Sequence, residues 1–573
     1  MISLASPSSV SDDIDSLFSA LDAAPSTIWI ALRAADEVMA DAQAIRERVD
    51  GGEGLPLAGL TFAVKDNIDV AAMQTTAAHP AFTRVADRHA TVVERLIAAG
   101  ALLIGKTNMD QFATGLVGAR SPHGVVTSAL DPQRVAGGSS SGSGAAVGHG
   151  LVDFSLGTDT AGSGRVPAAF NGILGIKPTL GLLPLDGVVP ASPSYDTVSV
   201  FATTTALAAR IMSVITGSSP TDPKSRDWAL DAPHAAPARP VIALPGRDDL
   251  VSLSPAARAM FDDAVTRFEA LGAEMRTIDL APFLATAALL YGGGLVSERA
   301  WSYGAFLAAH PEGADPSVAA IAAAAMQVDG TAVIDAQQSV AAATRHAREV
   351  LAGTDAMLIP TAPIHPTVDE VASDPIGVNS VVGTFTNFVN LMDMAAVAVP
   401  TGTIPDEGAF GVSIVTPRFH DQVALDLAAR LLGEPEQNAA LGVPGADVAV
   451  FGAHLSGEPL NPQLQSLGAR LVGEVRTADR FRMLLIEGEV DRPAVVRSTD
   501  GAEIPGELWR FSPVALSTLL RSIGAPLALG QIELADGSSV LGFTASVDLS
   551  QRDITDFGGW RAFRAASALP VTV

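Results

Sequence analysis

The stretch RVAGGSSSGSGAAVGHGLVDFSLGTDTAGSGRVPAAFNGILGIKPT (134–179) decides the fold of this chain of 573 residues. Glycine and serine at this density are typical of flexible linkers. That interpretation fails because an apolar segment, AAVGHGLVDFSLGTDTAG (145–162), interrupts the run. The glycines therefore indicate close backbone approach and unusual φ/ψ values. The Asp-Thr-Ala-Gly-Ser turn at 159–163 can aim successive N–H groups at one point, as an oxyanion hole requires, and this favours a serine nucleophile within the stretch.

Helical and strand-like patterns alternate around this stretch through the first 430 residues. ATVVERLIAAG (90–100) has helical apolar spacing, and ALLIGK (101–106) reads as a short buried strand. RPVIALPG (239–246) is a second strand pattern, followed by a helix pattern in SPAARAMFDDAVTRFEALG (254–272). DAMLIPTAP (355–363) is a third strand pattern. This alternation predicts an α/β fold in which helices cover a mixed sheet.

The composition changes near LLGEPEQNAALGVPGADVAV (431–450), where a Pro/Gly-punctuated polar stretch gives way to short strands and turns. We therefore expect a first domain over 1–433, a linker over 434–446 and a smaller α+β domain over 447–573. A second loop-like stretch, LDAPHAAPARP (230–240), is predicted to cross within the first domain.

Composition excludes several classes of function. The chain has 36 Lys+Arg against 62 Asp+Glu, a formal net charge of −26, and no cysteine. Disulfides, thiolate nucleophiles and cysteine-ligated metal centres are therefore impossible. An acidic surface repels phosphates, which argues against nucleic acid and anionic membranes as partners. Only four basic residues are lysines: Lys65, Lys106, Lys177 and Lys224.

The sequence shows neither a targeting signal nor a membrane-spanning segment. The N-terminus lacks the basic and continuous apolar regions of a secretion signal, and no run approaches the ~18 apolar residues of a membrane-spanning helix. The expected location is the cytoplasm. Because no convincing cluster of metal or cofactor ligands occurs, we predict that the protein needs neither a metal nor an organic cofactor.

Two familiar motifs match the chain but are set aside. Residues 100–107 (GALLIGKT) fit the phosphate-loop pattern, yet their middle residues are expected to form a strand. Residues 138–142 (GSSSG) fit the G-x-S-x-G elbow, yet no apolar strand immediately precedes them. Ten histidines leave a histidine partner available for such a serine. Neither motif carries the functional hypothesis.

Several motifs that follow one another in order along the chain support a functional hypothesis. GGSSSGSGAAV (137–147) and GTDTAGSGRVPAAFNGILGIKPT (157–179) resemble the signature of the amidase signature family of serine hydrolases. FAVKDNID (62–69) resembles the upstream lysine motif of that family, and LIGKTNMDQFATG (103–115) resembles its next block. The resemblance covers roughly residues 55–430. Two positions depart from the family pattern: Ala161, where glycine is usual, and Gly164, where a larger apolar residue is usual.

The resemblance implies a Ser–cis-Ser–Lys triad with Ser163 as nucleophile, Ser139 as bridging serine and Lys65 as base. It also implies a cis peptide bond before the bridging serine. The oxyanion donors implied are the backbone N–H groups of Thr160, Ala161, Gly162 and Ser163.

The chemistry of Lys65 is consistent with this role. A lysine has an ordinary pKa of about 10.4, so it acts as a base near pH 7 only where burial favours its neutral form. Arginine could not replace it, because guanidinium does not deprotonate in proteins. The alternative from the residues alone is that Lys65 pairs with Asp66 or Asp69.

A further resemblance indicates which class of amide is the substrate. LLYGGGLVSERAW (289–301) is similar to a segment of allophanate hydrolases, in which a tyrosine and an arginine contact a small carboxylate-bearing substrate. The resemblance implies substrate binding by Tyr291 and Arg299. An arginine can hold a carboxylate through two parallel N–H bonds. Pairing of Arg299 with Glu298 or another surface acid is the alternative from spacing alone.

The C-terminal region resembles the accessory domain of the same allophanate hydrolases in three segments: 448–475, GELWRF (506–511) and DITDFGGWRAF (553–563). In that family the domain is associated with decarboxylation of the first product. His454 matches the histidine implicated there, and histidine titrates near neutrality, so it can transfer the required proton.

The resemblance implies hydrolysis of allophanate to ammonia and a carboxylated carbamate, whose decarboxylation gives carbon dioxide and further ammonia. The implied partner is a small anionic amide, with a functional link to urea carboxylase or to a cyanuric acid or biuret pathway, and relatives suggest a homodimer. Three alternatives stay open: a broad-specificity amidase acting on other small amides, the catalytic subunit of a tRNA-dependent amidotransferase, and an inactive scaffold.

Overall fold

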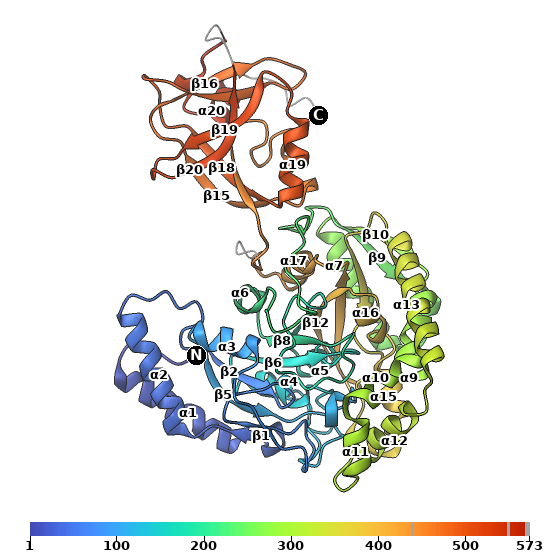
Figure 1. Cartoon of the computed structure of the whole chain (residues 1–573). Helices are drawn as coiled ribbons and strands as arrows, with labels where there is room; N and C mark the ends of the chain where they lie inside the picture. Colours follow the sequence, from blue (N-terminus) through green and yellow to red (C-terminus); the bar gives the residue numbers. More distant parts are fainter. Residues whose placement is uncertain (437–440, 547–550, 568–573) are drawn as a thin grey trace. The chain divides into compact units, whose positions relative to one another are not determined.

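The computed structural model describes residues 1–436, 441–546 and 551–567 (Figure 1). It divides into two compact units. The first comprises Met1–Asp227 and Arg239–Gly442, and the second comprises Trp228–Ala238 and Val443–Val573. The division at 442/443 falls inside the stretch 434–446 that was expected to be a linker.

The first unit is built on an 11-stranded mixed sheet. In spatial order its strands are β1 (Trp29–Leu32), β5 (Leu102–Thr107), β2 (Thr61–Lys65), β6 (Phe154–Asp159), β8 (Thr197–Ala202), β7 (Leu174–Lys177), β12 (Ala395–Ile404), β13 (Gly408–Thr416), β11 (Ala356–Pro360), β9 (Val241–Pro245) and β10 (Glu274–Ile278). Strand β2 runs parallel to both β5 and β6, whereas β6 and β8 are antiparallel. The predicted α/β class with a mixed sheet is confirmed.

Helices cover this sheet, and Figure 1 shows α9 to α13, in yellow-green, along one side of the first unit. The helices are α1 (Pro7–Ala23), α2 (Ala35–Asp50), α3 (Thr91–Ala98), α4 (Ser141–Gly148), α5 (Val166–Asn171), α6 (Thr205–Ile215), α7 (Pro255–Ala270), α8 (Ala281–Ala287), α9 (Leu289–Gly292), α10 (Ser297–Arg299), α11 (Ala305–Ala309), α12 (Pro316–Ala325), α13 (Gly330–Val350), α14 (Val368–Ser373), α15 (Gly377–Val382), α16 (Asn387–Leu391) and α17 (Asp421–Leu432). Within the described residues no single helix is apolar over a membrane-spanning length; α12 and α13 reach that length together but meet at a bend of 99°.

Local sequence signals account for several of these elements. Helix α7 begins after Ser254, whose side chain accepts a hydrogen bond from the amide of Ala257, and Pro255 occupies the first helical turn, where no N–H donor is needed. The predicted strand at 101–106 is β5, so the phosphate-loop match at 100–107 is a buried strand. The apolar pattern at 90–100 is helix α3, and the glycine that follows it, Gly100, has a φ of +91°.

The Gly/Ser-rich stretch forms a central helix. Helix α4 is buried from Ser141 to Val147 and contacts strands β2, β5, β6 and β8 as well as helix α5. A Cβ atom at Gly142 would lie 2.3 Å from the carbonyl oxygen of Ile28. Small residues are therefore required here because the helix packs closely on all sides, in agreement with the predicted close approach.

The second unit has a five-stranded sheet and a two-stranded sheet around its own core. The larger sheet has the order β15 (Arg470–Arg476), β18 (Pro505–Phe511), β14 (Ala446–Val450), β20 (Ser539–Ala545) and β19 (Leu527–Glu533). The other elements are β16 (Phe481–Ile486), β17 (Arg492–Arg497), α18 (Asn461–Ser466), α19 (Pro513–Ser522) and α20 (Trp560–Ser567). This agrees with the α+β character predicted for the second domain.

The loop 230–240 differs from its prediction. It was expected to cross within the first domain, but residues 228–238 group with the second unit. The amide of His234 donates to the carbonyl of Gly468 at 2.9 Å, and the amide of Val514 donates to the carbonyl of Leu230 at 3.2 Å. Backbone hydrogen bonds to partners more than 200 residues away hold the loop there, and local sequence carries no signal for such pairings.

The core of the second unit predicts a large effect of one substitution. Trp560 is 1% exposed, and its Nε1–H donates to Glu458 at 3.1 Å. Trp560→Ala should lower the free energy of unfolding of this unit by about 3–5 kcal/mol, because it leaves a cavity and an unpaired carboxylate. Chemical unfolding measures the effect. Leu520→Ala, at a position that is 54% exposed, is the control and should stay within about 0.5 kcal/mol. Equal effects of the two substitutions would contradict the packing described.

Candidate active site

Three chain segments meet at the carboxyl ends of neighbouring strands. Lys65 ends β2, and the turn carrying Ser163 follows β6. Because β2 and β6 are parallel, with Val64 opposite Leu156, both ends lie at the same edge of the sheet. Ser139 reaches this edge from the loop before α4. The structure thus brings the three predicted triad residues into one region, and all three side chains are buried.

Lys65 and Ser139 are in direct contact. Lys65 Nζ donates to Ser139 Oγ at 2.7 Å and to Thr158 Oγ1 at 2.8 Å. The peptide bond between Gly138 and Ser139 is cis, as the resemblance implies. Thr158 was not singled out from the sequence, although it lies in the quoted motif. Its position within β6 makes it a second hydrogen-bond acceptor that orients the amine.

Burial determines the acidity of Lys65. It lowers the pKa of the amine to about 7, against the opposing attraction of the carboxylates of Asp110, Asp159 and Asp196. The alternative pairing of Lys65 does not occur: Asp66 pairs with Lys106 at 3.0 Å, and Asp69 pairs with Arg84. A neutral amine is therefore accessible near physiological pH, as proton acceptance requires.

Ser163 points toward a different acceptor. Its Oγ donates to the carbonyl of Gly115 at 3.4 Å, and within the described residues no hydrogen bond joins it to Ser139. Hydrogen bonds between catalytic groups are often loose before substrate binds. The Lys65–Ser139 contact is thus present, whereas the Ser139–Ser163 hydrogen bond stays a prediction.

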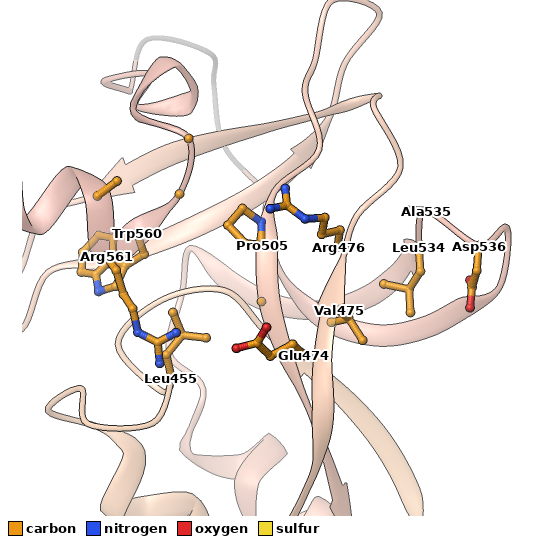
Figure 2. Close-up of a pocket in the computed structure, with 14 residues that line it drawn as sticks. Leu455, Glu474, Val475, Arg476, Pro505, Leu534, Ala535, Asp536, Trp560 and Arg561 are labelled. Atoms are coloured by element: carbon orange, nitrogen blue, oxygen red, sulfur yellow. The ribbon is translucent and has the colours of Figure 1, made fainter.

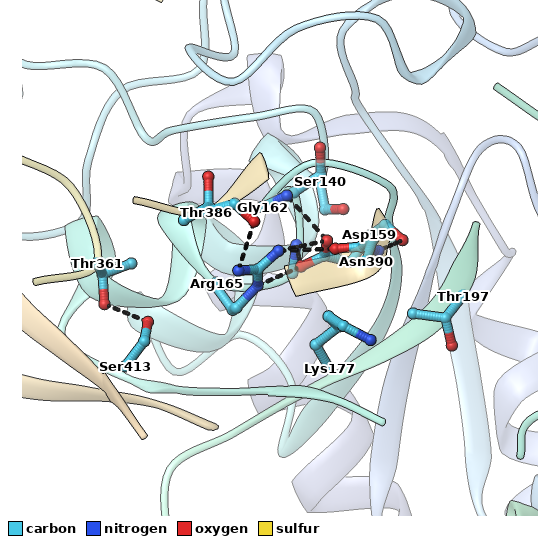
Figure 3. A network of polar contacts seen from close by, with 12 residues as sticks. Ser140, Asp159, Gly162, Arg165, Lys177, Thr197, Thr361, Thr386, Asn390 and Ser413 are labelled. Atoms are coloured by element: carbon cyan, nitrogen blue, oxygen red, sulfur yellow. Dashed lines mark hydrogen bonds and ion pairs between the residues drawn. The ribbon is translucent and has the colours of Figure 1, made fainter. Parts of the chain in front are cut away.

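The turn that carries Ser163 is held by one carboxylate. Asp159 accepts the amide of Gly162 at 2.8 Å (Figure 3). It also accepts the amide of Gly164 at 2.9 Å, so it holds the backbone on either side of the serine. This differs from the prediction that the Gly162 amide is an oxyanion donor, because that amide is already engaged. Within the described residues no hydrogen bond engages the amides of Thr160, Ala161 and Ser163. Those three amides stay candidate donors.

Glycine is needed at 162 for steric reasons. Its φ is +130°, which L side chains rarely adopt, and a Cβ atom there would lie 2.4 Å from Thr386 Oγ1. Ala161, which replaces the usual family glycine, is also buried but has a negative φ, so a methyl group is tolerated there.

A fully buried arginine neutralises Asp159. Arg165 forms two N–H···O bonds of 3.0 Å to the carboxylate, and its other N–H groups reach the carbonyl of Thr386 at 3.0 Å and Asn390 Oδ1 at 2.9 Å (Figure 3). Asn390 Nδ2 donates back to the carbonyl of Asp159 at 2.9 Å. Burial raises the pKa of Asp159, but the arginine outweighs it and holds that pKa below its ordinary value.

Sequence reasoning missed this network. Asp159 and Arg165 lie six positions apart within the quoted stretch, which was a usable signal for a local ion pair. Asn390 lies 225 positions from Arg165, and nothing in the local sequence indicates the contact.

A second carboxylate, Asp110, supports the loop of Ser139. It accepts the amides of Gly118 at 3.0 Å and Arg120 at 2.9 Å, while its own amide donates to the carbonyl of Ser139 at 3.0 Å. A Cβ atom at Gly138 would lie 2.0 Å from its Oδ2 atom. This contact explains why the loop carries glycine there.

Tyr291 and Arg299 are adjacent. The guanidinium carbon lies 4.3 Å from the centroid of the tyrosine ring, and Arg299 is completely buried. Its Nη1 donates to the carbonyl of Leu290 at 3.4 Å, while its Nε and Nη2 have no partner within the described residues. Glu298 accepts instead from Ser192 Oγ at 2.8 Å, so the alternative pairing with Arg299 does not occur.

One carboxylate links this arginine to the serine turn. Thr160 Oγ1 donates to Asp196 at 2.5 Å, and the positive charge of Arg299 acts on the same carboxylate. Burial raises the pKa of Asp196 to about 6 despite these contacts. A cavity of about 530 Å³ lies alongside, lined by Tyr291 and by Leu116, which follows the Gly115 carbonyl bonded to Ser163. Neither Arg299 nor Ser163 is among the residues that line this cavity.

His454 belongs to the second unit. It follows β14 and is 9% exposed; its Nε2 lies 3.0 Å from Gln463 Oε1, and its ring stacks on Phe543 at 4.8 Å. Burial lowers its pKa. A cavity of about 660 Å³ in this unit does not include it (Figure 2). That cavity is lined by Glu474 and by Arg561, whose charge is already paired with Glu507 at 2.8 Å. His454 lines a separate cavity of about 230 Å³.

No group of three or more His, Asp or Glu side chains in the described part of the chain is placed to hold a metal ion.

Two family models match the chain: residues 14–425 match the amidase family, and residues 446–565 match the allophanate hydrolase C-terminal domain. Urea amidolyase of Saccharomyces cerevisiae is 35% identical to this chain over a match that covers 96% of this chain and 32% of the length of the urea amidolyase. The match to the crystal structure of Kluyveromyces lactis urea amidolyase covers 99% of this chain and 36% of the urea amidolyase chain, with a TM-score of 0.88 and 33% identity. The match to the structure of K. lactis allophanate hydrolase covers 98% of this chain and 97% of the allophanate hydrolase chain, with a TM-score of 0.87 and 33% identity.

The chain therefore belongs to the amidase family. Within that family it joins the amidase domain to the C-terminal domain of the allophanate hydrolases. It spans about a third of the length of the urea amidolyases that it matches.

The contacts of Asp159 predict a loss of stability on neutralisation. Asp159→Asn leaves Arg165 buried without its counter-ion, so the free energy of unfolding should fall by about 3–5 kcal/mol. Equilibrium unfolding in urea measures this change in the free energy of unfolding. Asp263→Asn removes one partner of an exposed pair with Arg267 and should change the value by no more than about 1 kcal/mol. An Asp159→Asn variant as stable as this control would show that the pair does not hold the turn.

Proposed function

We propose that this protein hydrolyses allophanate, a urea that bears a carboxylate, by a serine amidase mechanism. The observation that carries the proposal is the buried Arg299 with unpartnered Nε and Nη2 atoms beside Tyr291. These two nitrogens lie on the same edge of the guanidinium, the edge that binds a carboxylate through two parallel hydrogen bonds. A buried arginine without a counter-ion is costly, and an anionic substrate would supply one.

The first step uses Lys65 as the base. Neutral Lys65 accepts a proton from Ser139 while Ser139 accepts one from Ser163, whose Oγ attacks the terminal amide carbonyl of allophanate. The amides of Thr160, Ala161 and Ser163 donate to the developing oxyanion. The tetrahedral intermediate collapses as its C–N bond breaks, and the proton held by Lys65 returns through Ser139 to the departing ammonia.

The second step removes the acyl group. Water replaces ammonia, gives its proton to the same serine–lysine pair, and attacks the acyl-enzyme carbonyl. Collapse of this intermediate frees Ser163 and a carboxylated carbamate. His454 in the second unit then serves the decarboxylation of that product, and the overall products are ammonia and carbon dioxide.

The name of the K. lactis allophanate hydrolase, a structure matched along nearly its whole length, supports this substrate. The match to urea amidolyases supports a functional link to urea carboxylation, while a cyanuric acid or biuret pathway stays an alternative source of allophanate. Homodimer formation and a cytoplasmic location stay predictions.

One observation favours the alternative of a broad-specificity amidase. The cavity of about 530 Å³ beside Tyr291 is larger than a substrate the size of allophanate requires. Kinetics on allophanate and on neutral aliphatic and aromatic amides separate the two functions, because only the first depends on a carboxylate.

The pH dependence of the reaction follows from Lys65. Its pKa of about 7 means that the amine is protonated, and unable to accept a proton, at lower pH. The value of kcat/KM for ammonia release should therefore fall about tenfold per pH unit below pH 7 and level off above it. Steady-state assays from pH 5 to 9 measure the profile. A profile that stays flat down to pH 5 would be incompatible with Lys65 as the base.

Substitution of Arg299 tests the substrate. Arg299→Met should lower kcat/KM for allophanate by about 30-fold or more, because one member of a buried charge pair is lost. Activity on neutral amides should change far less. The control is Arg345→Met, which alters an arginine whose side chain is 84% exposed. Assays of ammonia release measure kcat/KM for allophanate and for the neutral amides. Parallel losses on both would support the broad-specificity reading, and absence of ammonia release by the unmodified protein would support an inactive scaffold.

A further inference from the structure

A short segment of the first unit, residues 190–196, contacts two parts of the candidate active site. It leads into β8, which is antiparallel to β6 with Thr197 opposite Asp159. This register places Asp196 opposite Thr160, where the turn after β6 begins. The end of the segment and the start of the turn are therefore adjacent because their strands pair.

Asp196 binds the turn through a buried hydrogen bond. Thr160 Oγ1 donates to its Oδ1 atom at 2.5 Å, and both side chains are buried. The carboxylate also accepts the amides of Ala191 at 2.9 Å and Ser192 at 3.0 Å, which fold the segment around it. Asp196 therefore holds the first residue of the turn, whereas Asp159 holds two amides farther along it.

Glu298 attaches the same segment to helix α10, which ends with Arg299. Its Oε2 atom accepts from Ser192 Oγ at 2.8 Å and from the amide of Ser194 at 2.9 Å. Because Glu298 directly precedes Arg299 in the chain, the contacts that hold the glutamate also hold the backbone of the arginine.

Two further hydrogen bonds support the segment from outside. Ser302 Oγ, a few residues beyond α10, donates to the carbonyl of Pro190. Asn390 Nδ2 donates to the carbonyl of Tyr195 at 3.0 Å and to that of Asp159 at 2.9 Å. The segment is thus bonded at its start to the stretch of α10, and at its end to the network that holds the serine turn.

Asp196 and Arg299 attract each other without forming an ion pair. The positive charge of the arginine acts on the carboxylate, yet no ion pair joins the two within the described residues. Arg299 Nε and Nη2 have no hydrogen-bond partner there. The donors to Asp196 hold its carboxylate in place, so these nitrogens of Arg299 stay available for the carboxylate of a substrate.

The chemistry of the substrate makes the spacing of the two sites important. In allophanate a single nitrogen separates the carboxylate from the carbonyl that Ser163 attacks. Arg299 and the oxyanion amides must therefore bind two groups that are one atom apart, and a misplacement of about 1 Å can cost 100-fold in rate. A segment that is hydrogen-bonded to both sites determines the distance between them.

We propose that residues 190–196 set the spacing between Arg299 and the turn of Ser163, and thereby select amides whose carboxylate lies one atom from the attacked carbonyl. Asp196 is a positioning residue for the turn, and Glu298 is a positioning residue for the arginine, because each acts through another residue. This inference rests on the proposed function, since it takes a carboxylate-bearing amide as the substrate.

The test compares two probes of different length with full-length protein. Malonamate has one CH₂ group in place of the nitrogen of allophanate, and succinamate has two. The unmodified protein should prefer malonamate by at least about tenfold in kcat/KM, because the longer amide cannot place both of its groups at once. Assays of ammonia release measure this ratio. If only allophanate is hydrolysed, the inhibition constants of the two probes against allophanate give the same ratio.

Glu298→Ala removes the acceptor for Ser192 and Ser194 and loosens the arginine. KM for malonamate should rise about tenfold with a smaller change in kcat, and the malonamate-to-succinamate ratio should fall at least about fivefold. A general loss of folded protein would lower both rates equally and leave the ratio unchanged. Glu298→Gln keeps an oxygen acceptor and should recover most of the ratio. The control is Glu349→Ala, at a side chain 62% exposed.

Thr160→Val tests Asp196 independently of the substrate. Valine resembles threonine in shape but lacks the hydroxyl that bonds Asp196, so the turn should be less well held. Labelling of Ser163 by a serine-directed fluorophosphonate should slow at least about fivefold, and by a smaller factor in Glu298→Ala. Thr160→Ser restores the hydroxyl and should recover most of the labelling rate. The control is Thr266→Val, at an exposed position of α7.

A second variant decides if Thr160→Val does not fold. Asp196→Asn keeps one oxygen acceptor but turns an NH₂ group toward backbone N–H donors, so labelling should slow at least about threefold. Labelling at the unmodified rate in the folded variant would overturn the role of Asp196.

The outcomes separate the two proposals. Absence of allophanate hydrolysis by the unmodified protein would refute the proposed function, while the labelling rates would still decide the role of Asp196. Hydrolysis of allophanate together with equal values for malonamate and succinamate would refute the spacing alone. An unchanged ratio in Glu298→Ala would likewise show that the segment does not set the distance.

Discussion

The buried ion pair between Asp159 and Arg165 is the constraint on which the turn carrying Ser163 depends. The carboxylate accepts the amides on both sides of Ser163, and the arginine compensates its charge in a region from which water is excluded. A carboxylate buried alone would become protonated and would release the turn, since burial favours the neutral form. The pair therefore fixes the backbone on both sides of Ser163, while Asn390 joins it to a helix far along the chain.

The same burial that requires a counter-ion at Asp159 makes it easier for the amine of Lys65 to lose its proton. Removal from water lowers the pKa of the amine to about 7, and the acids around it are engaged by other donors rather than by Lys65 itself. Asp66, its neighbour in sequence, is occupied by Lys106. The two lysines thus differ: Lys65 has a lowered pKa and no ion pair with Asp66, whereas Lys106 keeps Asp66 as its partner.

Each unit contains an arginine with a buried nitrogen that has no hydrogen-bond partner among the described residues, Arg299 in the first and Arg492 in the second. In a chain with a formal net charge of −26 these are local exceptions to the overall charge. The net charge argues against nucleic acid and anionic membranes as partners, whereas these individual arginines favour small anions as ligands.

The sequence by itself determined the α/β class and the order of the motifs, because these depend on periodicity and on residue types at short spacing. The expectation that Lys65, Ser139 and Ser163 act together came from the resemblance of those motifs to the amidase signature family. Only the tertiary structure decided that the Gly162 amide belongs to Asp159 and that residues 228–238 belong to the second unit. It also decided that Glu298 leaves Arg299 unpaired. The physical reason is common to all three: hydrogen-bond partners are selected by which groups become buried together, and burial joins segments whose separation along the chain carries no local signal.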